Sequence, residues 1–303
     1  MRQSIAERLV RSGAVLAEGS TRALGHKGYW HALSLLAKIA PNRVTHVRVN
    51  GVNLEISMRD PYWLRIVAPG YEYEVEVLEL IAELSVLPFD FVDAGANLGF
   101  WTAFVGKDSS RRRIVAIEPN PETFAILQRN TQQLEGTVVL LNAGLVTEPA
   151  DSVELYVPKR GQRHTDGSVV KPRDKQRFQC FTVQAVTLDL LLSEYLSESE
   201  CVLLKLDVEG LEKEILRQAN NLKDSRIAIV YEDHGSDSRH EASAALVGSP
   251  FYTVFFLSPG KGPIPIQDLR ILDRLKPEST RGYNLFAVPN TGIWANHMDR
   301  AFG

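Results

Sequence analysis

The sequence predicts an α/β protein: a mostly parallel sheet covered by helices on both faces, preceded by an N-terminal helical arm and a β-hairpin. Two observations support this fold class. From residue 73 onward, short apolar runs alternate with segments of helical period, which is typical of parallel strands joined by crossover helices. Before residue 70, apolar residues first recur at helical spacing and then alternate strictly with polar residues, as in a β-hairpin. We therefore divide the chain into an arm, residues 1–70, and an α/β domain, residues 71–303.

The composition is that of an ordinary globular protein and disfavours several classes. The 303 residues are 44% hydrophobic and 23% charged, and the net charge of -3 does not favour a nucleic-acid partner. No apolar run approaches the ~18 to 20 residues of a transmembrane helix, and the charged first eleven residues lack the apolar core of a signal peptide. Two cysteines cannot form a disulfide framework, which suits a reducing compartment. We expect a cytoplasmic protein.

The arm is predicted as two helices followed by a hairpin. Residues 4–19 and 29–40 place apolar side chains three and four positions apart, and a proline ends the second helix. Residues 45–58 then alternate around Asn50-Gly51, a dipeptide strongly favoured in two-residue hairpin turns. We expect this arm either to cover the active site or to build a homo-oligomer.

The α/β domain opens with a helix at residues 73–84, which stops near Pro88. Seven apolar runs of strand length follow, and helical segments separate most of them. The predicted strands are residues 89–95, 113–120, 138–146, 201–210, 226–233, 252–258 and 283–289. The predicted helices are residues 99–107, 121–134, 186–196 and 211–222. The last two strands lack a clear intervening helix, which favours an antiparallel pair at the sheet edge.

A long basic segment, residues 157–178, interrupts this alternation. Loops of that length in compact domains are usually functional or disordered, so we expect this one and residues 234–245 to select the ligand. His164 lies in the first of them and is a candidate to reach a substrate, although a lone loop histidine is more often solvated.

A glycine-rich turn follows the first strand of the domain, in the stretch FVDAGANLGFW. Asp93 ends the apolar run, and Gly95, Asn97 and Gly99 come next. Ligands of open parallel sheets bind at such carboxyl ends of strands. In a dinucleotide-binding fingerprint, the middle glycine would stand at the position of Asn97 and the third glycine at the position of Phe100. Without these glycines the turn is not suited to bind a pyrophosphate.

Glu118 ends the next strand, at the place of the acid that accepts hydrogen bonds from a ribose diol. A ribose-bearing ligand without a pyrophosphate indicates S-adenosylmethionine. Asp93 would hold its ammonium group through water, and N–H groups of the turn would meet its carboxylate. The simpler alternative is that Gly95 and Gly99 only form a turn and that Glu118 caps the following helix.

Acids also end two later strands. Asp207 and Glu209 follow one of them, and Glu232, Asp233 and His234 follow the next. Neighbouring parallel strands would bring Asp207, Glu232 and Asp233 to one spot, where three carboxylates repel one another unless a cation relieves them. Mg²⁺ is typically held by a few carboxylates with water and substrate.

Such a metal would hold a substrate hydroxyl and lower its pKa, and His234 or Glu209 would take the proton as general base. The alternative is that these acids are solvated or cap helices, as Asp and Glu do most often. Glu209 in particular would suit the first turn of the helix that follows it.

These motifs resemble the FkbM-type methyltransferases. The blocks that carry the resemblance are FVDAGANLGFWT, IVAIEPNPETFAILQRN, LNAGL, VTLDLLL and LLKLDVEGLEKEIL, in the family's order. They span roughly residues 70–290. The resemblance implies a Rossmann-like class I methyltransferase fold: a seven-stranded, mostly parallel sheet with a reversed edge strand that binds S-adenosylmethionine. It also implies methylation of hydroxyls, commonly on sugars or natural products.

Mapped residue by residue, the resemblance assigns the cofactor site to Asp93, Gly95, Asn97, Gly99 and Glu118, with Asn142 and Ala143 beside the adenine. In related macrolide-sugar methyltransferases, acids that match Asp207, Glu232 and Asp233 bind Mg²⁺. A histidine that some relatives use as base corresponds to Gly210 in this chain, so His234 is our substitute for it.

The leading hypothesis is therefore an S-adenosylmethionine-dependent O-methyltransferase, assisted by a divalent metal. Its acceptor would be a hydroxyl of a sugar, a glycan or a glycosylated natural product. A second hypothesis is metal-independent transfer to another small metabolite, with Glu209 or His234 acting directly. A third is a methyltransferase-like protein that binds a ligand and does no chemistry. A nucleic-acid methyltransferase is disfavoured by the acidic balance.

Overall fold

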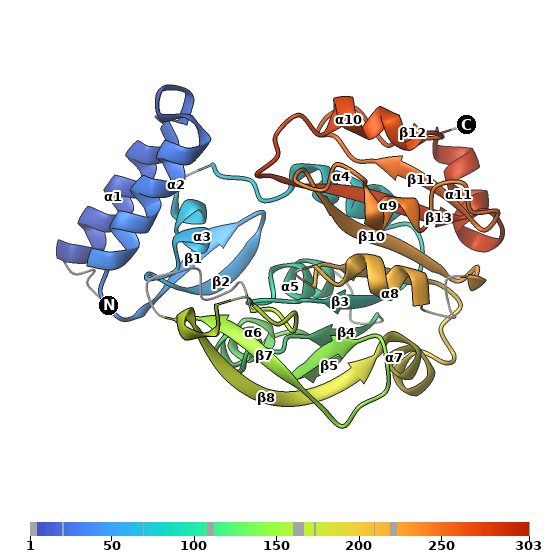
Figure 1. The fold of residues 1–303 in the computed structure, drawn as a ribbon, viewed down its shortest axis with the longest axis horizontal. Helices are drawn as coiled ribbons and strands as arrows, with labels where there is room; N and C mark the ends of the chain where they lie inside the picture. Colours follow the sequence, from blue (N-terminus) through green and yellow to red (C-terminus); the bar gives the residue numbers. More distant parts are fainter. Residues whose placement is uncertain are drawn as a thin grey trace.

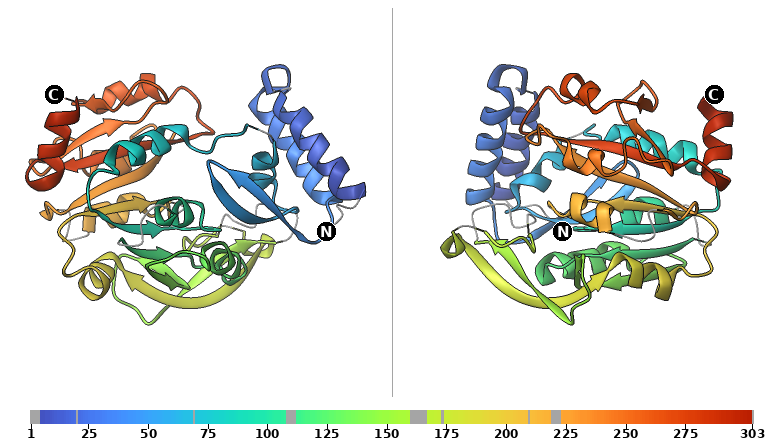
Figure 2. Two further views of the ribbon diagram at one scale, coloured as in Figure 1. Left: turned by 180° about the vertical axis from the view of Figure 1, so that it is seen from behind. Right: turned by 45° about the vertical axis from the view of Figure 1, so that its right-hand side comes forward.

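The computed structural model describes residues 5–19, 21–68, 70–107, 112–159, 167–172, 174–208, 210–218 and 223–302. It consists of an α/β domain with the arm standing against one side of it (Figures 1 and 2). Within these ranges, no helix is long and apolar enough to cross a membrane.

The arm begins with two helices, α1 (Ile5–Gly19) and α2 (Thr21–Ile39), which pack side by side. The predicted hairpin is confirmed: β1 (Val44–Val49) pairs antiparallel with β2 (Val52–Ser57). Asn50 and Gly51 both have positive φ, at 48° and 80°, which is what a tight hairpin turn of the favoured hand requires. Two short helices follow, α3 (Pro61–Leu64) and the 3₁₀ helix η1 (Arg65–Val67).

The main sheet has eight strands in the order β12-β11-β13-β10-β9-β3-β4-β5. Their bounds are β3 (Asp90–Ala94), β4 (Arg113–Ile117), β5 (Thr137–Leu141), β9 (Val202–Leu206), β10 (Ile227–His234), β11 (Tyr252–Phe256), β12 (Ile264–Ile266) and β13 (Gly282–Pro289). The five strands from β5 to β10 pair parallel, while β13 runs antiparallel to both β10 and β11. The predicted mostly parallel sheet with a reversed strand is confirmed.

Two details of this prediction were wrong. The reversed strand β13 lies inside the sheet, between β10 and β11, and not at its edge. The edge is an eighth strand, β12, which a turn with Gly260 and Gly262 at positive φ returns antiparallel to β11. With only three residues, β12 is too short to produce an alternation that a sequence pattern reveals.

Helices cover both faces of the sheet, as predicted. They are α4 (Val75–Leu84), α5 (Phe100–Gly106), α6 (Pro121–Thr131), α7 (Leu188–Tyr195), α8 (Glu212–Gln218), α9 (Glu241–Ala244), α10 (Leu272–Leu275) and α11 (Gly292–Phe302), with the 3₁₀ helices η2 (Lys175–Arg177) and η4 (Leu269–Ile271). One core cluster joins α4, α5 and α11 to the sheet through Leu80, Phe100 and Trp294. Another joins α7 and α8 to it through Leu191 and Ile215.

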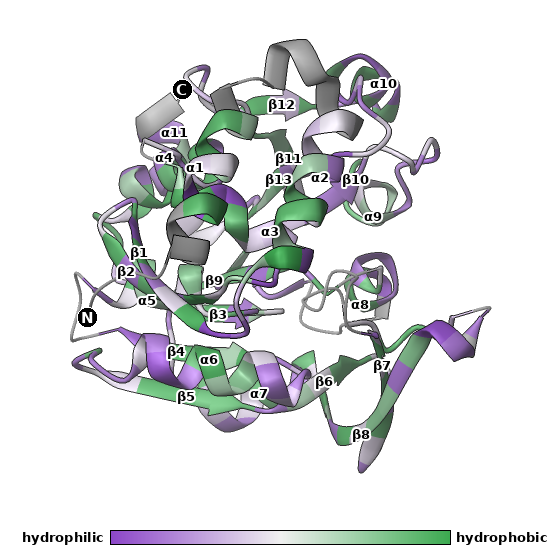
Figure 3. Cartoon of the chain, turned by 90° about the vertical axis from the view of Figure 1, so that its left-hand side faces the viewer, coloured by the Kyte–Doolittle hydropathy of each residue, from purple (hydrophilic) through white to green (hydrophobic). Residues whose placement is uncertain are grey.

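A second, three-stranded sheet was not predicted. It consists of β6 (Ala143–Val146), β8 (Phe178–Thr187) and β7 (Ser152–Pro158), in that order. The predicted single strand 138–146 is in fact β5 and β6, which belong to different sheets and are separated at Asn142. In β8 the apolar residues are interrupted by Gln179, Thr182 and Gln184, and no strand was predicted there (Figure 3). Residues 160–166, which include His164, lie outside the described ranges.

Candidate active site

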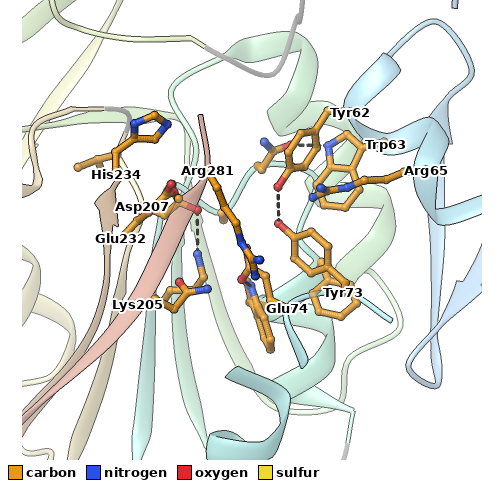
Figure 4. Close-up of a pocket in the computed structure, with 18 of the residues that line it drawn as sticks. Tyr62, Trp63, Arg65, Tyr73, Glu74, Lys205, Asp207, Glu232, His234 and Arg281 are labelled. Carbon is orange, nitrogen blue, oxygen red and sulfur yellow. Dashed lines mark hydrogen bonds and ion pairs between the residues drawn. The ribbon is translucent and has the colours of Figure 1, made fainter. Parts of the chain in front are cut away.

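A cavity of about 650 Å³ opens at the carboxyl ends of β3, β4, β9 and β10, where the arm meets the α/β domain (Figure 4). The domain contributes the glycine turn after β3 and the residues that end the neighbouring strands. The arm contributes aromatic side chains from α2 and α3, and the segment of the domain before α4 contributes Tyr71 and Tyr73. This is the sheet edge where the sequence predicted a ligand.

The glycine turn needs glycine for two separate reasons. Gly95 has φ +83°, and a Cβ atom there would overlap the backbone carbonyl of Asp207 at the end of β9. Gly99 has φ +89°, and a Cβ there would lie 2.6 Å from Cδ1 of Leu127 in α6. Gly95 therefore lets two strand ends approach each other, and Gly99 lets α5 pack on α6. Of the two, only Gly95 lines the cavity.

Asn97 occupies the middle of the turn with φ +53°, a conformation that asparagine tolerates better than most residues. Its Oδ1 accepts hydrogen bonds from the N–H of Leu98 (2.8 Å) and from Nε1 of Trp63 (3.1 Å). The side chain thus closes its own turn and ties it to the arm. An asparagine at this position holds the arm over the ligand site, which a glycine would not do.

Asp93 is fully buried and does not line the cavity. Its Oδ2 accepts hydrogen bonds from the N–H (2.9 Å) and the hydroxyl (2.6 Å) of Thr102, so it fixes the first turn of α5. Its Oδ1 is buried without a hydrogen-bond partner among the described residues. Burial raises the pKa of Asp93, against the opposing effects of Lys205 and Thr102.

Glu118 follows β4, lines the cavity and is only 6% exposed. Its two oxygens accept hydrogen bonds from the N–H groups of Asn97 (2.9 Å) and Asn120 (2.8 Å). Burial raises the pKa of Glu118 to about 7, although both hydrogen bonds act to lower it. The cap of α6 is Asn120, whose Oδ1 accepts from the N–H of Glu122. Glu118 is thus not needed as that cap, and each of its oxygens can accept a further hydrogen bond.

Asn142 and Ala143 do not line the cavity. The amide nitrogen of Asn142 donates to the backbone oxygens of Glu118 (2.8 Å) and Pro119 (3.0 Å), so it braces the segment that carries the acid. Ala143 is buried in the core. The apolar lining at this end of the cavity comes instead from Pro119 and from Leu145 of β6.

Lys205 is a functional candidate that the sequence analysis missed. It lies in the otherwise apolar strand β9, and its Nζ is 3.0 Å from Oδ2 of Asp207, two residues further on the same side of the strand. Its side chain is 5% exposed, that of Asp207 is 26% exposed, and both line the cavity. Burial alone lowers the pKa of Lys205, but the carboxylates of Asp207, Glu74 and Asp93 raise it above its usual value. Lys205 is therefore a permanent positive charge in this wall.

The acids that end β10 do not all face the cavity. Glu232 and His234 line it, whereas Asp233 points to the opposite face because successive side chains of a strand alternate. Asp233 is buried there, forms an ion pair with Lys276 and accepts a hydrogen bond from the hydroxyl of Ser243. The expected convergence of three carboxylates is thus reduced to Asp207 and Glu232. Glu209 lies outside the described residues.

His234 lies at the mouth of the cavity. Its Nδ1 accepts a hydrogen bond from the N–H of Ser236 (3.2 Å) and lies 2.6 Å from the hydroxyl of that residue. Burial and the charge of Lys276 lower the pKa of His234. The lowered pKa favours the neutral imidazole, and the N–H of Ser236 engages Nδ1 as an acceptor.

The arm supplies an aromatic wall that sequence analysis also missed. The hydroxyls of Tyr62 and Tyr73 lie 3.0 Å apart, and the ring of Tyr73 packs on Phe100 at the start of α5. Glu74, the next residue after Tyr73, also lines the cavity; it has φ +43° and accepts a hydrogen bond from Nε1 of Trp101 (3.1 Å). A strained, non-glycine residue in a cavity wall is typical of a functional position. The sequence signal was the unusual aromatic density of PYW and YEY.

The order of the main sheet and this cavity define a class I methyltransferase. Residues 93–251, more than half of the chain, match the Methyltransferase FkbM domain family. The chain belongs to the FkbM methyltransferase family, as its sequence motifs predicted.

Two relatives show how far the similarity extends. The chain is 28% identical over 165 residues to the hexuronic acid methyltransferase AglP of Haloferax volcanii, which covers 53% of this chain and 62% of that protein. It is 30% identical over 171 residues to methyltransferase 1 of Beauveria bassiana, covering 49% and 69%. The chain thus spans less than two thirds of the length of the Haloferax relative.

Solved methyltransferases also match the chain, at low identity and low TM-score. A SAM-dependent O-methyltransferase of Thermotoga maritima has a TM-score of 0.37 at 11% identity, covering 83% of this chain and 80% of that one. A tRNA (uracil-54, C5)-methyltransferase of Pyrococcus abyssi in complex with S-adenosyl-L-homocysteine has a TM-score of 0.40 at 11% identity, covering 82% and 45%. At these scores the likeness adds nothing to what the sheet order establishes.

Proposed function

We propose that this chain transfers the methyl group of S-adenosylmethionine to a hydroxyl of a sugar or glycosylated metabolite, without a metal ion. One observation carries the proposal: the same cavity holds the acid Glu118 beside the glycine turn and the Lys205–Asp207 pair. The first suits a ribose-bearing cofactor, and the second suits proton transfer from an acceptor. The Haloferax relative is a hexuronic acid methyltransferase, which supports a sugar acceptor here.

In this proposal, the cofactor lies along the carboxyl ends of β3 and β4. Glu118 accepts hydrogen bonds from the ribose diol, and Pro119 and Leu145 contact the adenine. The methionine end passes the turn at Gly95 toward Asp207. The acids of this region attract the cationic sulfonium, which S-adenosylhomocysteine lacks.

The affinity for S-adenosylhomocysteine is expected to fall as the pH is lowered through 7. Glu118 has a pKa of about 7 in the empty site, and two ribose hydroxyls can donate one to each oxygen only when the carboxyl is ionised, because a protonated oxygen is itself a donor. Affinity should therefore be constant above pH 8 and about tenfold weaker at pH 6. Calorimetric titrations at pH 6, 7 and 8 measure this. Glu118→Gln should bind weakly at each pH, and an affinity of wild type that does not change with pH would contradict the role of Glu118.

The reaction is an in-line displacement at the methyl carbon. The acceptor oxygen forms a bond to that carbon while the carbon–sulfur bond breaks, and the bonding electrons leave with sulfur as neutral S-adenosylhomocysteine. The hydroxyl proton passes to the carboxylate of Asp207, which the ammonium of Lys205 holds in place. Lys205 keeps its own proton because its pKa is raised. Holding oxygen and methyl in near-attack geometry supplies much of the rate.

The residues of this cavity do not fit the expected Mg²⁺ site. Within the described part of the chain, no group of three or more His, Cys, Asp or Glu side chains could hold a metal ion. The ammonium of Lys205 already neutralises Asp207, where a cation would have to bind, and Asp233 faces away. We therefore assign no step to a metal. Turnover should be the same in excess chelator and in millimolar Mg²⁺, and its abolition by chelator would contradict this assignment.

Replacing Asp233 should lower the free energy of unfolding and leave turnover unchanged. In Asp233→Ala the buried Lys276 ammonium loses its counter-ion, which typically destabilises a protein by about 3 to 5 kcal/mol. Urea unfolding measures the loss, and the double variant Asp233→Ala, Lys276→Met should recover part of it. Turnover at a temperature where the variant is folded should remain close to wild type. A large loss of turnover in the folded variant would show that Asp233 takes part in catalysis.

A methyl-transfer assay tests the proposed function. Purified protein is incubated with methyl-labelled S-adenosylmethionine and a panel of methyl glycosides, and the label in the glycosides is counted. We expect transfer by wild type and none by Glu118→Ala. The absence of both transfer and cofactor binding in wild type would overturn the proposal.

A further inference from the structure

A guanidinium group from the arm lies in the aromatic wall of the cavity. Arg65 begins η1, and its Cζ lies 3.9 Å from the ring centroid of Tyr62 and 5.3 Å from that of Tyr73. The rings of Trp30 and Tyr71 are each 5.7 Å away. Rings that flank a guanidinium hold its plane through their π faces and leave its N–H edges for other partners.

Within the described residues, Arg65 has no carboxylate partner. No ion pair joins it to an acid there, and its Nε is buried without a hydrogen-bond acceptor. Of the other cations that line the cavity, Lys205 is paired with Asp207, and Arg281 has its Cζ 5.3 Å from the ring centroid of Tyr283. A buried donor without an acceptor costs free energy, so an unpaired guanidinium in a cavity wall indicates a missing anionic partner.

Arg65 lies on the acceptor side of the cavity. Figure 4 shows it entering from the arm, with the Lys205–Asp207 pair on the other side. The carboxylate that raises the pKa of Arg65 is that of Glu74, whereas the carboxylates that raise the pKa of Glu118 are those of Asp93 and Asp207. An acceptor held between Asp207 and the arm would therefore present one end to Arg65 while its hydroxyl meets Asp207.

We propose that Arg65 binds a carboxylate of the acceptor, so that this enzyme methylates a hydroxyl of an acidic sugar such as a uronic acid. The planar fork of a guanidinium matches the two oxygens of a carboxylate, which Lys cannot do as well. The surrounding rings contact the apolar faces of the sugar. This inference rests on the proposed function and adds the substrate class. The carboxylate is held and keeps its charge, so the product is an ether and not an ester.

The test compares two anionic and two neutral probes. The probes are the methyl glycosides of glucuronic and galacturonic acid and those of glucose and galactose. Wild type should prefer the uronides by at least about tenfold in kcat/KM. Arg65→Gln should lower kcat/KM for the uronides by about 10- to 100-fold, the loss typical of a charged hydrogen-bonded pair, and change the neutral probes by less than about threefold. Arg65→Lys should recover part of the loss.

Arg48→Gln is the matched control, because it removes a positive charge from β1 of the same arm at an exposed position outside the cavity. It should leave all four rates unchanged. The affinity of Arg65→Gln for S-adenosylhomocysteine should equal that of wild type. A lost affinity would mean that Arg65 serves the cofactor, and an equal loss on anionic and neutral probes would mean that it serves the fold. Either result overturns the inference.

A binding measurement separates this inference from the proposed function. The uronides are titrated into protein saturated with S-adenosylhomocysteine, and binding is expected for wild type and not for Arg65→Gln. If S-adenosylhomocysteine binds but neither uronide does, the acidic acceptor is wrong and the methyltransferase proposal stands. Binding of glucose 6-phosphate in place of the uronides would likewise contradict a carboxylate. A methyl product that mild alkali releases would be an ester, and that too would contradict the inference.

Discussion

Gly95→Ala is expected to destabilise the protein more than any other single methyl group added to the chain. The new Cβ would overlap the carbonyl of Asp207, and the backbone has φ +83°, where L-residues are strained. Because both partners are backbone, neither can rotate away. We expect a loss of about 4 kcal/mol or more in the free energy of unfolding, measured by urea denaturation. Binding of S-adenosylhomocysteine should be lost with it.

Gly248→Ala is the matched control for that prediction. Gly248 has φ +82°, nearly the same as Gly95, but a Cβ there would meet no atom within 4 Å. It isolates the backbone strain, which costs roughly 1 to 2 kcal/mol. Similar losses in the two variants would show that Gly95 is needed only for its φ, and that β3 and β9 do not approach as closely as the structure has them.

Asp207→Asn should lower turnover by about 10² to 10⁴-fold while the affinity for S-adenosylhomocysteine changes little. The amide keeps the size of the side chain but cannot take the proton of the acceptor hydroxyl. Steady-state kinetics with saturating cofactor measure the loss, and it should appear in kcat as well as in kcat/KM. Lys205 loses its counter-ion in this variant, so stability must be measured beside it.

His234→Asn provides the comparison. The acceptor nitrogen of His234 is engaged by Ser236, so we expect its replacement to change turnover by less than about tenfold. If His234→Asn loses activity and Asp207→Asn keeps it, the base is the histidine that the sequence suggested, and the role given to Asp207 is wrong.

The sequence predicted those features of the fold that depend on a few neighbouring residues. The hairpin was recognised because Asn50 and Gly51 tolerate positive φ, and the glycine turn because Gly95 and Gly99 follow an apolar strand. The family motifs also placed Glu118 correctly in the cavity. Each of these depends on a few consecutive residues and their spacing.

Features that depend on distant contacts were not predicted. Lys205 lies in a run of buried residues. Its raised pKa follows from the carboxylates of Asp207, Glu74 and Asp93, which come together around it in the fold. The separation of Glu232 from Asp233 follows from strand alternation, once β10 is known to continue through both. Proximity along the chain had suggested that adjacent acids act together, whereas adjacent strand residues face opposite ways.

The arm is where sequence reasoning contributed least. Its helices and hairpin were predicted, but nothing in the sequence indicated that Trp63 would donate to Asn97 of the glycine turn. Nor was there a signal that Arg65 would enter the cavity, since a single arginine between apolar residues is an ordinary surface pattern. The Trp63–Asn97 contact joins residues 34 positions apart, and Arg65 lines the cavity together with residues from distant parts of the chain, so only the tertiary structure reveals either feature.

Calorimetric titration of metal-stripped protein with S-adenosylhomocysteine tests whether the glycine turn and Glu118 hold the methyl donor. Wild type should bind with a micromolar dissociation constant, unaffected by added Mg²⁺, and Glu118→Ala should lose most of that affinity. Such a result would establish that the turn after β3 and the acid after β4 together hold the methyl donor. The absence of binding by wild type, with and without Mg²⁺, would contradict the account.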